Sequence, residues 1–139
     1  MSQALIAGIS RTTRPQSALR RFLALDAVVT GGNGLAYLLA SDALGELLGL
    51  DAGLLFDLGL FLTAYAIGVA LLAARPQPPA AGVKAVIDCN ILWTVGSLLA
   101  LAGWLEPTTA GLLWIPMQAA TVAGFAGLQW AALRATTRA

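Results

Sequence analysis

Four long apolar stretches constrain what this chain can fold into. They cover residues 22–40, 54–74, 84–103 and 109–133. A hydrocarbon core about 30 Å thick is crossed by about 20 residues of helix at about 1.5 Å per residue. Inside lipid each backbone N–H and C=O group needs a partner within its own segment, so helices are favoured. The sequence predicts an all-α, membrane-spanning antiparallel four-helix bundle, with residues 1–139 forming one transmembrane domain.

Composition supports this class and excludes several others. The chain is 58% hydrophobic and 11% charged, against about 25% charged in soluble domains. Its net charge of +1 with scattered basic residues gives no nucleic-acid footprint, so the expected partner is the lipid bilayer. Histidine is absent and Cys89 is the only cysteine, which removes the usual haem and zinc sites. No cofactor or metal site is evident, and without a nucleophile and base pair a binding role is favoured over an enzyme.

The placement of charge predicts the orientation. Four acids, Asp42, Glu46, Asp51 and Glu106, lie in the first and third loops. The basic residues lie in the tails and the central hairpin: Arg11, Arg14, Arg20, Arg21, Arg75, Lys84, Arg134 and Arg138. Cytoplasmic loops carry the excess of Lys and Arg, so we expect both termini in the cytoplasm and residues 1–21 as a basic cytoplasmic tail. Abundant alanine and arginine indicate a GC-rich bacterial genome, hence a multi-pass protein of the bacterial cytoplasmic (inner) membrane.

The first apolar stretch carries a polar stripe. Asp26, Thr30, Asn33 and Tyr37 stand at offsets of four, seven and eleven residues, which places them on one helical face. A carboxylate, a hydroxyl, an amide and a phenol are costly against hydrocarbon. This face is therefore predicted to look inward, onto other helices or onto a ligand.

The third and fourth stretches carry similar stripes. Asn90 and Thr94 lie four residues apart, while Gln118, Thr121 and Gln129 follow offsets of three and eleven. These groups either bridge helices, at about 0.6 kcal/mol each, or converge on a pocket with aromatic walls. In the second case the candidate ligand-binding residues are Asp26, Thr30, Asn33, Tyr37, Tyr65, Asn90, Trp93, Thr94, Trp114, Gln118 and Thr121. Asn33 and Gln118 lie about 16 and 14 Å from opposite membrane faces, so we expect them at similar depth.

Asp26 has two interpretations. It pairs with Arg20, Arg21 or Lys84 near the interface, or it is a proton-binding or ligand-binding carboxylate at the inner mouth of a cavity. Lys84 and Asp88 stand four residues apart and can pair locally. The second interpretation predicts a small proton-coupled transporter or channel that uses Asp26 or Asp88. Turnover of a lipid substrate by a membrane-embedded carboxylate also stays open.

The chain resembles the broad DoxX-like group of small bacterial four-span proteins. The resemblance lies in the basic Leu19–Arg21 start, the glycine-bearing first span and the outer segment Ala40–Leu50. More narrowly, Leu25–Leu38 and Asn90–Trp93 are similar to actinobacterial integral membrane proteins. The resemblance implies an accessory or small-molecule-binding membrane protein, sometimes linked to redox complexes.

Small residues suggest association between copies. Glycines follow one another at Gly31, Gly32 and Gly34, and small residues recur at four-residue spacing at Gly96 and Gly124 with Ala100 and Ala120. Such positions let helices approach closely. We expect a homo-oligomer or a subunit of a larger membrane complex.

Overall fold

The computed structural model describes residues 15–138, and within this range every regular element is a helix. The elements are α2 (Pro15–Leu39), α3 (Ser41–Leu48), α4 (Ala52–Ala73), α5 (Ala80–Gly103) and α6 (Thr109–Arg138). Four of them, all but α3, are long and apolar enough to cross a membrane. The prediction of an all-helical chain with four candidate spans is confirmed. Arg11 and Arg14 of the expected tail lie outside the described residues.

Three helices extend at least four residues beyond the predicted spans, and α4 begins two residues early. α2 begins at Pro15 rather than residue 22, α5 at Ala80 rather than 84, and α6 continues to Arg138 rather than 133. Proline is well suited to the first helical turn because its missing N–H would have no intrahelical partner there. The thickness of the hydrocarbon determines which residues must be apolar, but it does not end a helix.

The turn between α3 and α4 is built from local capping contacts. Gly49 adopts a left-handed conformation with φ 71°, and the backbone N–H groups of Gly49 and Leu50 both donate to Gly45 O. Glycine accepts this conformation without a steric cost. Asp51 then caps α4 by accepting a hydrogen bond from Leu54 N at 2.9 Å.

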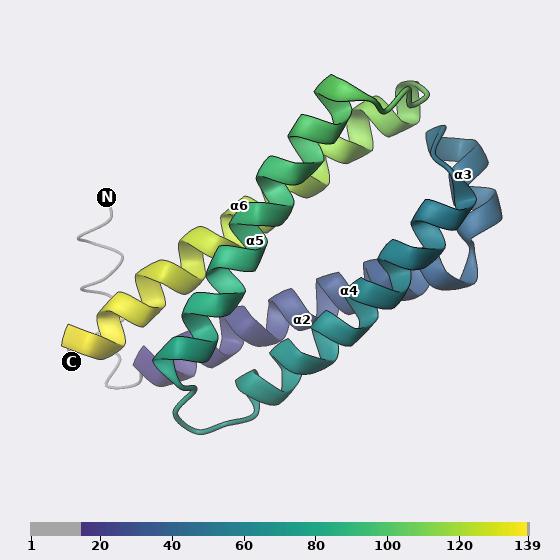
Figure 1. Ribbon diagram of the computed structural model, residues 1–139. Coiled ribbons are helices and arrows are strands. Elements are labelled where there is room, and N and C mark those ends of the chain that lie inside the picture. Colours follow the sequence, from purple (N-terminus) through teal and green to yellow (C-terminus); the bar gives the residue numbers. More distant parts are fainter. Residues whose placement is uncertain (1–14, 139) are drawn as a thin grey trace.

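The long helices form two pairs (Figure 1). α2 packs along α4, and α5 packs along α6, while contacts between α2 and α6 join the pairs. The backbones of α4 and α5, although consecutive, are close to each other at few positions, and these helices meet through side chains. In Figure 1 the pairs come together where α2 begins and α6 ends, and they separate toward α3. The main apolar core contains residues of all four helices, among them Leu19, Leu23, Val69, Val83 and Ala132.

Glycine allows a close contact between α2 and α4. A Cβ atom on Gly59 would stand 2.7 Å from Leu38 N and 2.8 Å from Gly34 O. Both neighbours are backbone atoms, so any side chain would push the helices apart. A Cβ atom added to Gly32 or to Gly124 would have no neighbouring heavy atom within 4 Å. Of the glycines noted in the first span, Gly34 lies at this contact, and Gly31 also faces α4, where its Cβ would stand 3.3 Å from Ala66 Cβ.

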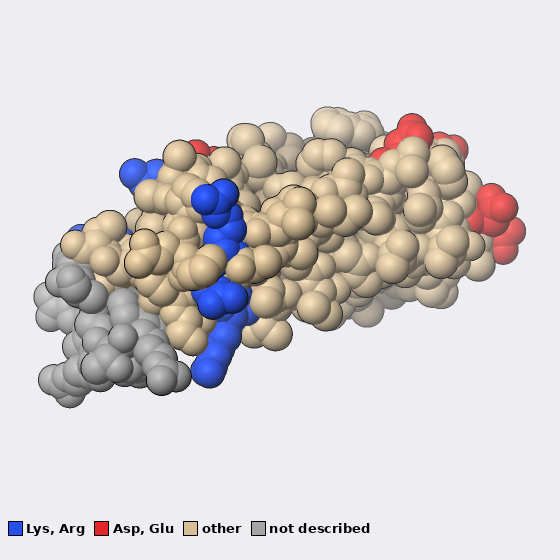
Figure 2. Space-filling model, turned by 90° about the horizontal axis from the view of Figure 1, so that it is seen from below, with Lys and Arg blue, Asp and Glu red and all other residues tan. Residues whose placement is uncertain are grey.

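Charged side chains separate along the molecule (Figure 2). Lys and Arg gather toward one end of the described region, and most Asp and Glu side chains lie at the opposite end. The basic end holds the start of α2, the α4–α5 turn and the end of α6. The basic and acidic residues, which occupy different loops in the sequence, thus also lie at opposite ends of the described region.

Candidate functional site

A buried carboxylate lies where the two helix pairs meet. Asp26 on α2 has no exposed surface. Its Oδ1 atom accepts a hydrogen bond from Thr30 Oγ1 at 2.8 Å. Its Oδ2 atom accepts from Asn90 Nδ2 at 2.8 Å and from Gln129 Nε2 at 2.7 Å. The three donors are one hydroxyl and two amides, so the groups that hold this carboxylate are neutral.

These contacts belong to a network that includes all four long helices. Asn90 Nδ2 also donates to Gln129 Oε1 at 3.1 Å. The Tyr65 hydroxyl of α4 donates to Asn90 Oδ1 and to Val86 O, both at 3.2 Å. Asn90 is 3% exposed and Gln129 is not exposed. Because polar groups in an apolar interior are costly without partners, this network fixes the mutual rotation of the helices.

The side-chain amides of Asn90 and Gln129 bind Asp26, and the cations that were expected as its partners do not. Arg20 Nε donates instead to Ala73 O at 2.9 Å, while Arg21 and Lys84 are exposed. Arg20 lies six residues before Asp26, and Lys84 lies six residues before Asn90. Six residues make about 1.7 helical turns. Arg20 therefore lies on a different face of α2 from Asp26, and Lys84 lies on a different face of α5 from Asn90. Asp88 is exposed as well.

A pocket of about 790 Å³ adjoins this network between the two helix pairs. Eight of the candidate residues line it: Thr30, Asn33, Tyr65, Asn90, Trp93, Trp114, Gln118 and Thr121. The remaining lining is mostly apolar: Val28, Val29, Gly32, Ala36, Phe61, Leu62, Cys89, Leu92, Met117 and Val122. The stripes of the first, third and fourth spans therefore do face a common space.

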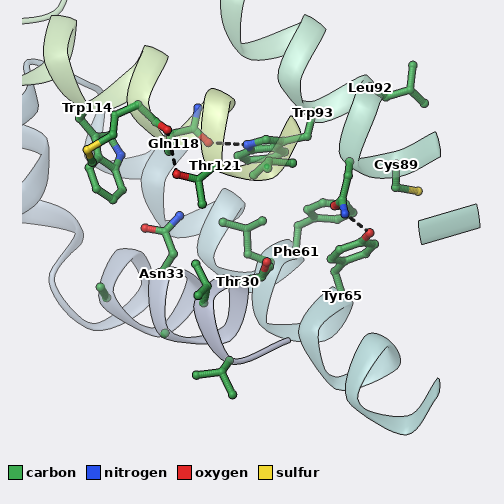
Figure 3. A pocket seen from close by; sticks show the side chains of 18 residues that line it. Thr30, Asn33, Phe61, Tyr65, Cys89, Leu92, Trp93, Trp114, Gln118 and Thr121 are labelled. Atoms are coloured by element: carbon green, nitrogen blue, oxygen red, sulfur yellow. Dashed lines mark hydrogen bonds between the residues drawn. The ribbon is translucent and has the colours of Figure 1, made fainter. Parts of the chain in front are cut away.

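One side of the pocket is a stack of aromatic rings. Phe61 lies between Tyr65 and Trp93, with ring centroids 5.9 and 6.4 Å apart and interplanar angles of 18° and 10°. Figure 3 shows these side chains along the α4 and α5 side of the pocket. Centroid distances of this size between near-parallel rings correspond to offset stacking, and this side of the pocket is an aromatic surface against which a flat ligand can pack.

The polar groups of the pocket differ in their partners. Trp93 Nε1 donates to Gln118 Oε1 at 2.6 Å, and Gln118 Nε2 donates to Ile115 O at 2.9 Å. Among the hydrogen bonds of residues 15–138, none involves the side chain of Asn33. Its amide points into the pocket toward Thr121 (Figure 3). Asn33 therefore has the full hydrogen-bonding capacity of its amide left for a ligand.

Three candidates lie outside the pocket. Asp26 is behind the lining residues Thr30 and Asn90, to which it is hydrogen-bonded. Tyr37 is 5% exposed, and its hydroxyl accepts from Trp114 Nε1 at 2.7 Å. Thr94 donates to the backbone at Asn90 O and Ala119 O. Tyr37 and Thr94 thus bridge helices in this structure.

Two important residues were not among the candidates from the sequence. Phe61 forms the middle of the aromatic stack, and its spacing of four residues from Tyr65 predicts a shared helical face. Gln129 lies on the polar stripe of the fourth span, four residues from the same membrane face as Asp26, which is four residues into the first span. The depth argument used for Asn33 and Gln118 therefore also indicates this pair. The two residues lie 103 residues apart in the chain.

Comparison of the chain with protein-family models, with curated proteins and with solved structures gives no match. The resemblance to the DoxX-like group therefore stays a prediction, and the case for a function comes from the geometry of the site.

Proposed function

We propose that this chain is a multi-pass membrane protein of binding or accessory type, whose pocket between the helix pairs holds a flat, apolar small molecule such as a quinone or a ring-bearing lipid. The observation that carries the proposal is the aromatic stack of Tyr65, Phe61 and Trp93 beside the unpaired amide of Asn33. Stacked rings contact the faces of a planar ligand, and the amide N–H donates to a ligand carbonyl.

The size and position of the pocket support a ligand that arrives from the bilayer. Ligand pockets usually measure about 300 to 1,000 Å³ and combine apolar walls with a few polar groups, and this pocket measures about 790 Å³. Phe61 and Leu92 are 53% and 69% exposed. In a membrane these residues contact lipid, so an apolar molecule can enter between α4 and α5 without passing through water.

Replacing Phe61 by alanine is expected to weaken binding of 2-methyl-1,4-naphthoquinone about tenfold. An aromatic pair contributes about 0.5 to 1.5 kcal/mol beyond buried area, and 1.4 kcal/mol corresponds to a factor of about ten. Binding is measured in detergent by quenching of tryptophan fluorescence, in a background where Trp104 and Trp130 are changed to phenylalanine. Trp93 and Trp114, which line the pocket, then report alone.

Phe56→Ala is the matched control for Phe61→Ala. Both phenylalanines lie on α4 and are partly exposed, at 43% and 53%, but Phe56 is not among the residues that line the pocket. We expect Phe56→Ala to bind like the wild type. Equal affinity of both variants, or quenching that never saturates, would contradict the proposed site.

A second candidate function is proton-coupled transport or a proton channel. The buried carboxylate of Asp26, held by three neutral donors, favours it because intramembrane acids are typical of proton pathways. In this alternative Asp26 is the carrier, and exposed Asp88 near Lys84 belongs to the cytoplasmic mouth.

For placement in the cell we propose an antiparallel four-helix bundle in the bacterial cytoplasmic membrane, with both termini and the α4–α5 turn in the cytoplasm. The separation of charge in Figure 2 supports this orientation. A homo-oligomer or a larger membrane complex stays a proposal that rests on the small residues of α5 and α6, whose Gly96 and Gly124 have no neighbour within 4 Å.

Cysteine labelling in intact cells tests this orientation. In a Cys89→Ser background, Glu106→Cys is expected to react with a membrane-impermeant maleimide, whereas Gln77→Cys is expected to react only after the membrane is opened. Both side chains are exposed in the structure, so accessibility within the protein is matched. The reverse pattern overturns the orientation, and labelling of both sites from outside overturns the spanning arrangement.

A further inference from the structure

Two adjoining hollows follow the line between α5 and α6, outside the pocket described above. The first, of about 300 Å³, is lined chiefly by Ile87, Ile91, Val95, Ala126, Gly127 and Trp130. The second, of about 310 Å³, includes the charged side chains of Lys84, Asp88 and Arg134. Ile87 and Trp130 line both. The two hollows therefore adjoin at these side chains, and we call them together the α5–α6 groove, which is apolar in the first hollow and charged in the second.

The charged end of the groove favours an anion. Two cations, Lys84 and Arg134, and one acid, Asp88, give it a net positive charge at neutral pH. The Arg134 guanidinium carbon lies 4.9 Å from the centroid of the Trp130 ring, and this cation–π contact holds the guanidinium at the rim. Guanidinium groups bind phosphate oxygens through paired hydrogen bonds, and a lysine adds a point charge.

The apolar part of the groove indicates what kind of anion fits. It runs from Ile87 to Val95 along α5, about 12 Å by helical rise, and its lining offers almost only hydrocarbon. A small inorganic anion would leave this surface uncovered. A molecule with a phosphate at one end and a long hydrocarbon chain matches both parts.

We propose that the α5–α6 groove is a binding site for one anionic phospholipid of the phosphatidylglycerol type. The phosphate contacts Lys84 and Arg134, and one acyl chain lies in the apolar part beside Gly127. The basic end of the molecule (Figure 2) places the headgroup in the leaflet that faces the cytoplasm. The site is separate from the aromatic pocket. It rests on the proposal that the four helices span a membrane, and the leaflet of the headgroup rests on the proposed orientation.

Gly127 provides a direct test of the apolar part. A Cβ on Gly127 or on Gly68 of α4 would meet nothing within 4 Å, so the side chain of a leucine begins in open space at either position. Only Gly127 lines the groove. We expect Gly127→Leu to reduce retention of palmitoyl-oleoyl phosphatidylglycerol at least fivefold in native mass spectrometry, while Gly68→Leu retains the wild-type level.

The charged part is tested by Lys84→Gln combined with Arg134→Gln. This variant is expected to lose the preference for palmitoyl-oleoyl phosphatidylglycerol over the phosphatidylcholine of the same chains, and Arg75→Gln, a cation on the α4–α5 turn outside the groove, is expected to keep it. Equal retention of both lipids by the wild type overturns the proposal. Competition by inorganic phosphate together with full retention by Gly127→Leu also overturns it, because the site would then bind a free anion only.

Discussion

Replacing Asp26 by leucine is expected to lower the free energy of unfolding by about 3 kcal/mol. The change leaves one amide donor of Asn90 and one of Gln129 without an acceptor in a fully buried place, and each such group costs about 1 to 3 kcal/mol. Thr30 contributes little to the loss, since a helical threonine can donate to the carbonyl four residues before it. The measurement is unfolding in mixed micelles with increasing dodecyl sulfate, followed by far-ultraviolet circular dichroism.

Asp57→Leu provides the matched control on α4. Asp57 is exposed, and its replacement is expected to change the unfolding free energy by less than about 0.5 kcal/mol. Asp26→Asn keeps the volume and one acceptor oxygen, so a loss of about 1 kcal/mol is expected. Wild-type stability in Asp26→Leu would show that the network is not needed for the fold.

The Asp26→Asn variant also separates the two candidate functions, because it is expected to stay folded. Vesicles that contain the protein and a trapped pH-sensitive dye are given an external acid pulse. Proton entry with the wild type and none with Asp26→Asn would favour the proton-coupled transporter. Equal, slow entry in both, together with saturable naphthoquinone binding, favours the binding protein.

Gly59→Ala is expected to lower the free energy of unfolding by about 2 to 3 kcal/mol. The new methyl group would lie within 3 Å of the backbone at Leu38 and Gly34, and backbone atoms can move aside only if α2 and α4 separate. Unfolding in the same mixed micelles measures the loss.

Gly68→Ala is the companion variant on the same helix. A Cβ on Gly68 has nothing within 4 Å, and alanine is the better helix former by roughly 0.5 to 1 kcal/mol. We expect stability equal to the wild type or slightly higher. If Gly59→Ala and Gly68→Ala unfold together, the close approach of α2 and α4 is not a source of stability.

The sequence alone was sufficient to predict features that belong to one helix at a time, namely the positions of the spans and their polar faces. Bilayer thickness sets the length of an apolar stretch, so the four candidate spans could be located from hydropathy and length alone. Helical periodicity gave the faces that carry Asn33 and Gln118, and equal depth placed them at one level. The structure has both along the same pocket.

Relations between helices were harder to predict. Periodicity identifies a polar face but not the neighbour that it meets, so the partners considered for Asp26 were cations or a ligand and not the amides of Asn90 and Gln129. The part played by Gly59 depends on Leu38 across the contact, and among 15 glycines no sequence signal singles it out. Such information appears only once the helices are packed.

The buried network has a consequence for the order in which the chain is made. During synthesis α2 and α4 precede α5 and α6, and the glycine contact allows the first two to pack without later residues. Until α5 and α6 are made, Thr30 is the one direct hydrogen-bond donor to Asp26 that is already present. The amides that complete the set lie 64 and 103 residues further along the chain. An unfinished chain therefore holds a partly unpaired carboxylate among apolar helices, and only insertion of the last helix removes that cost.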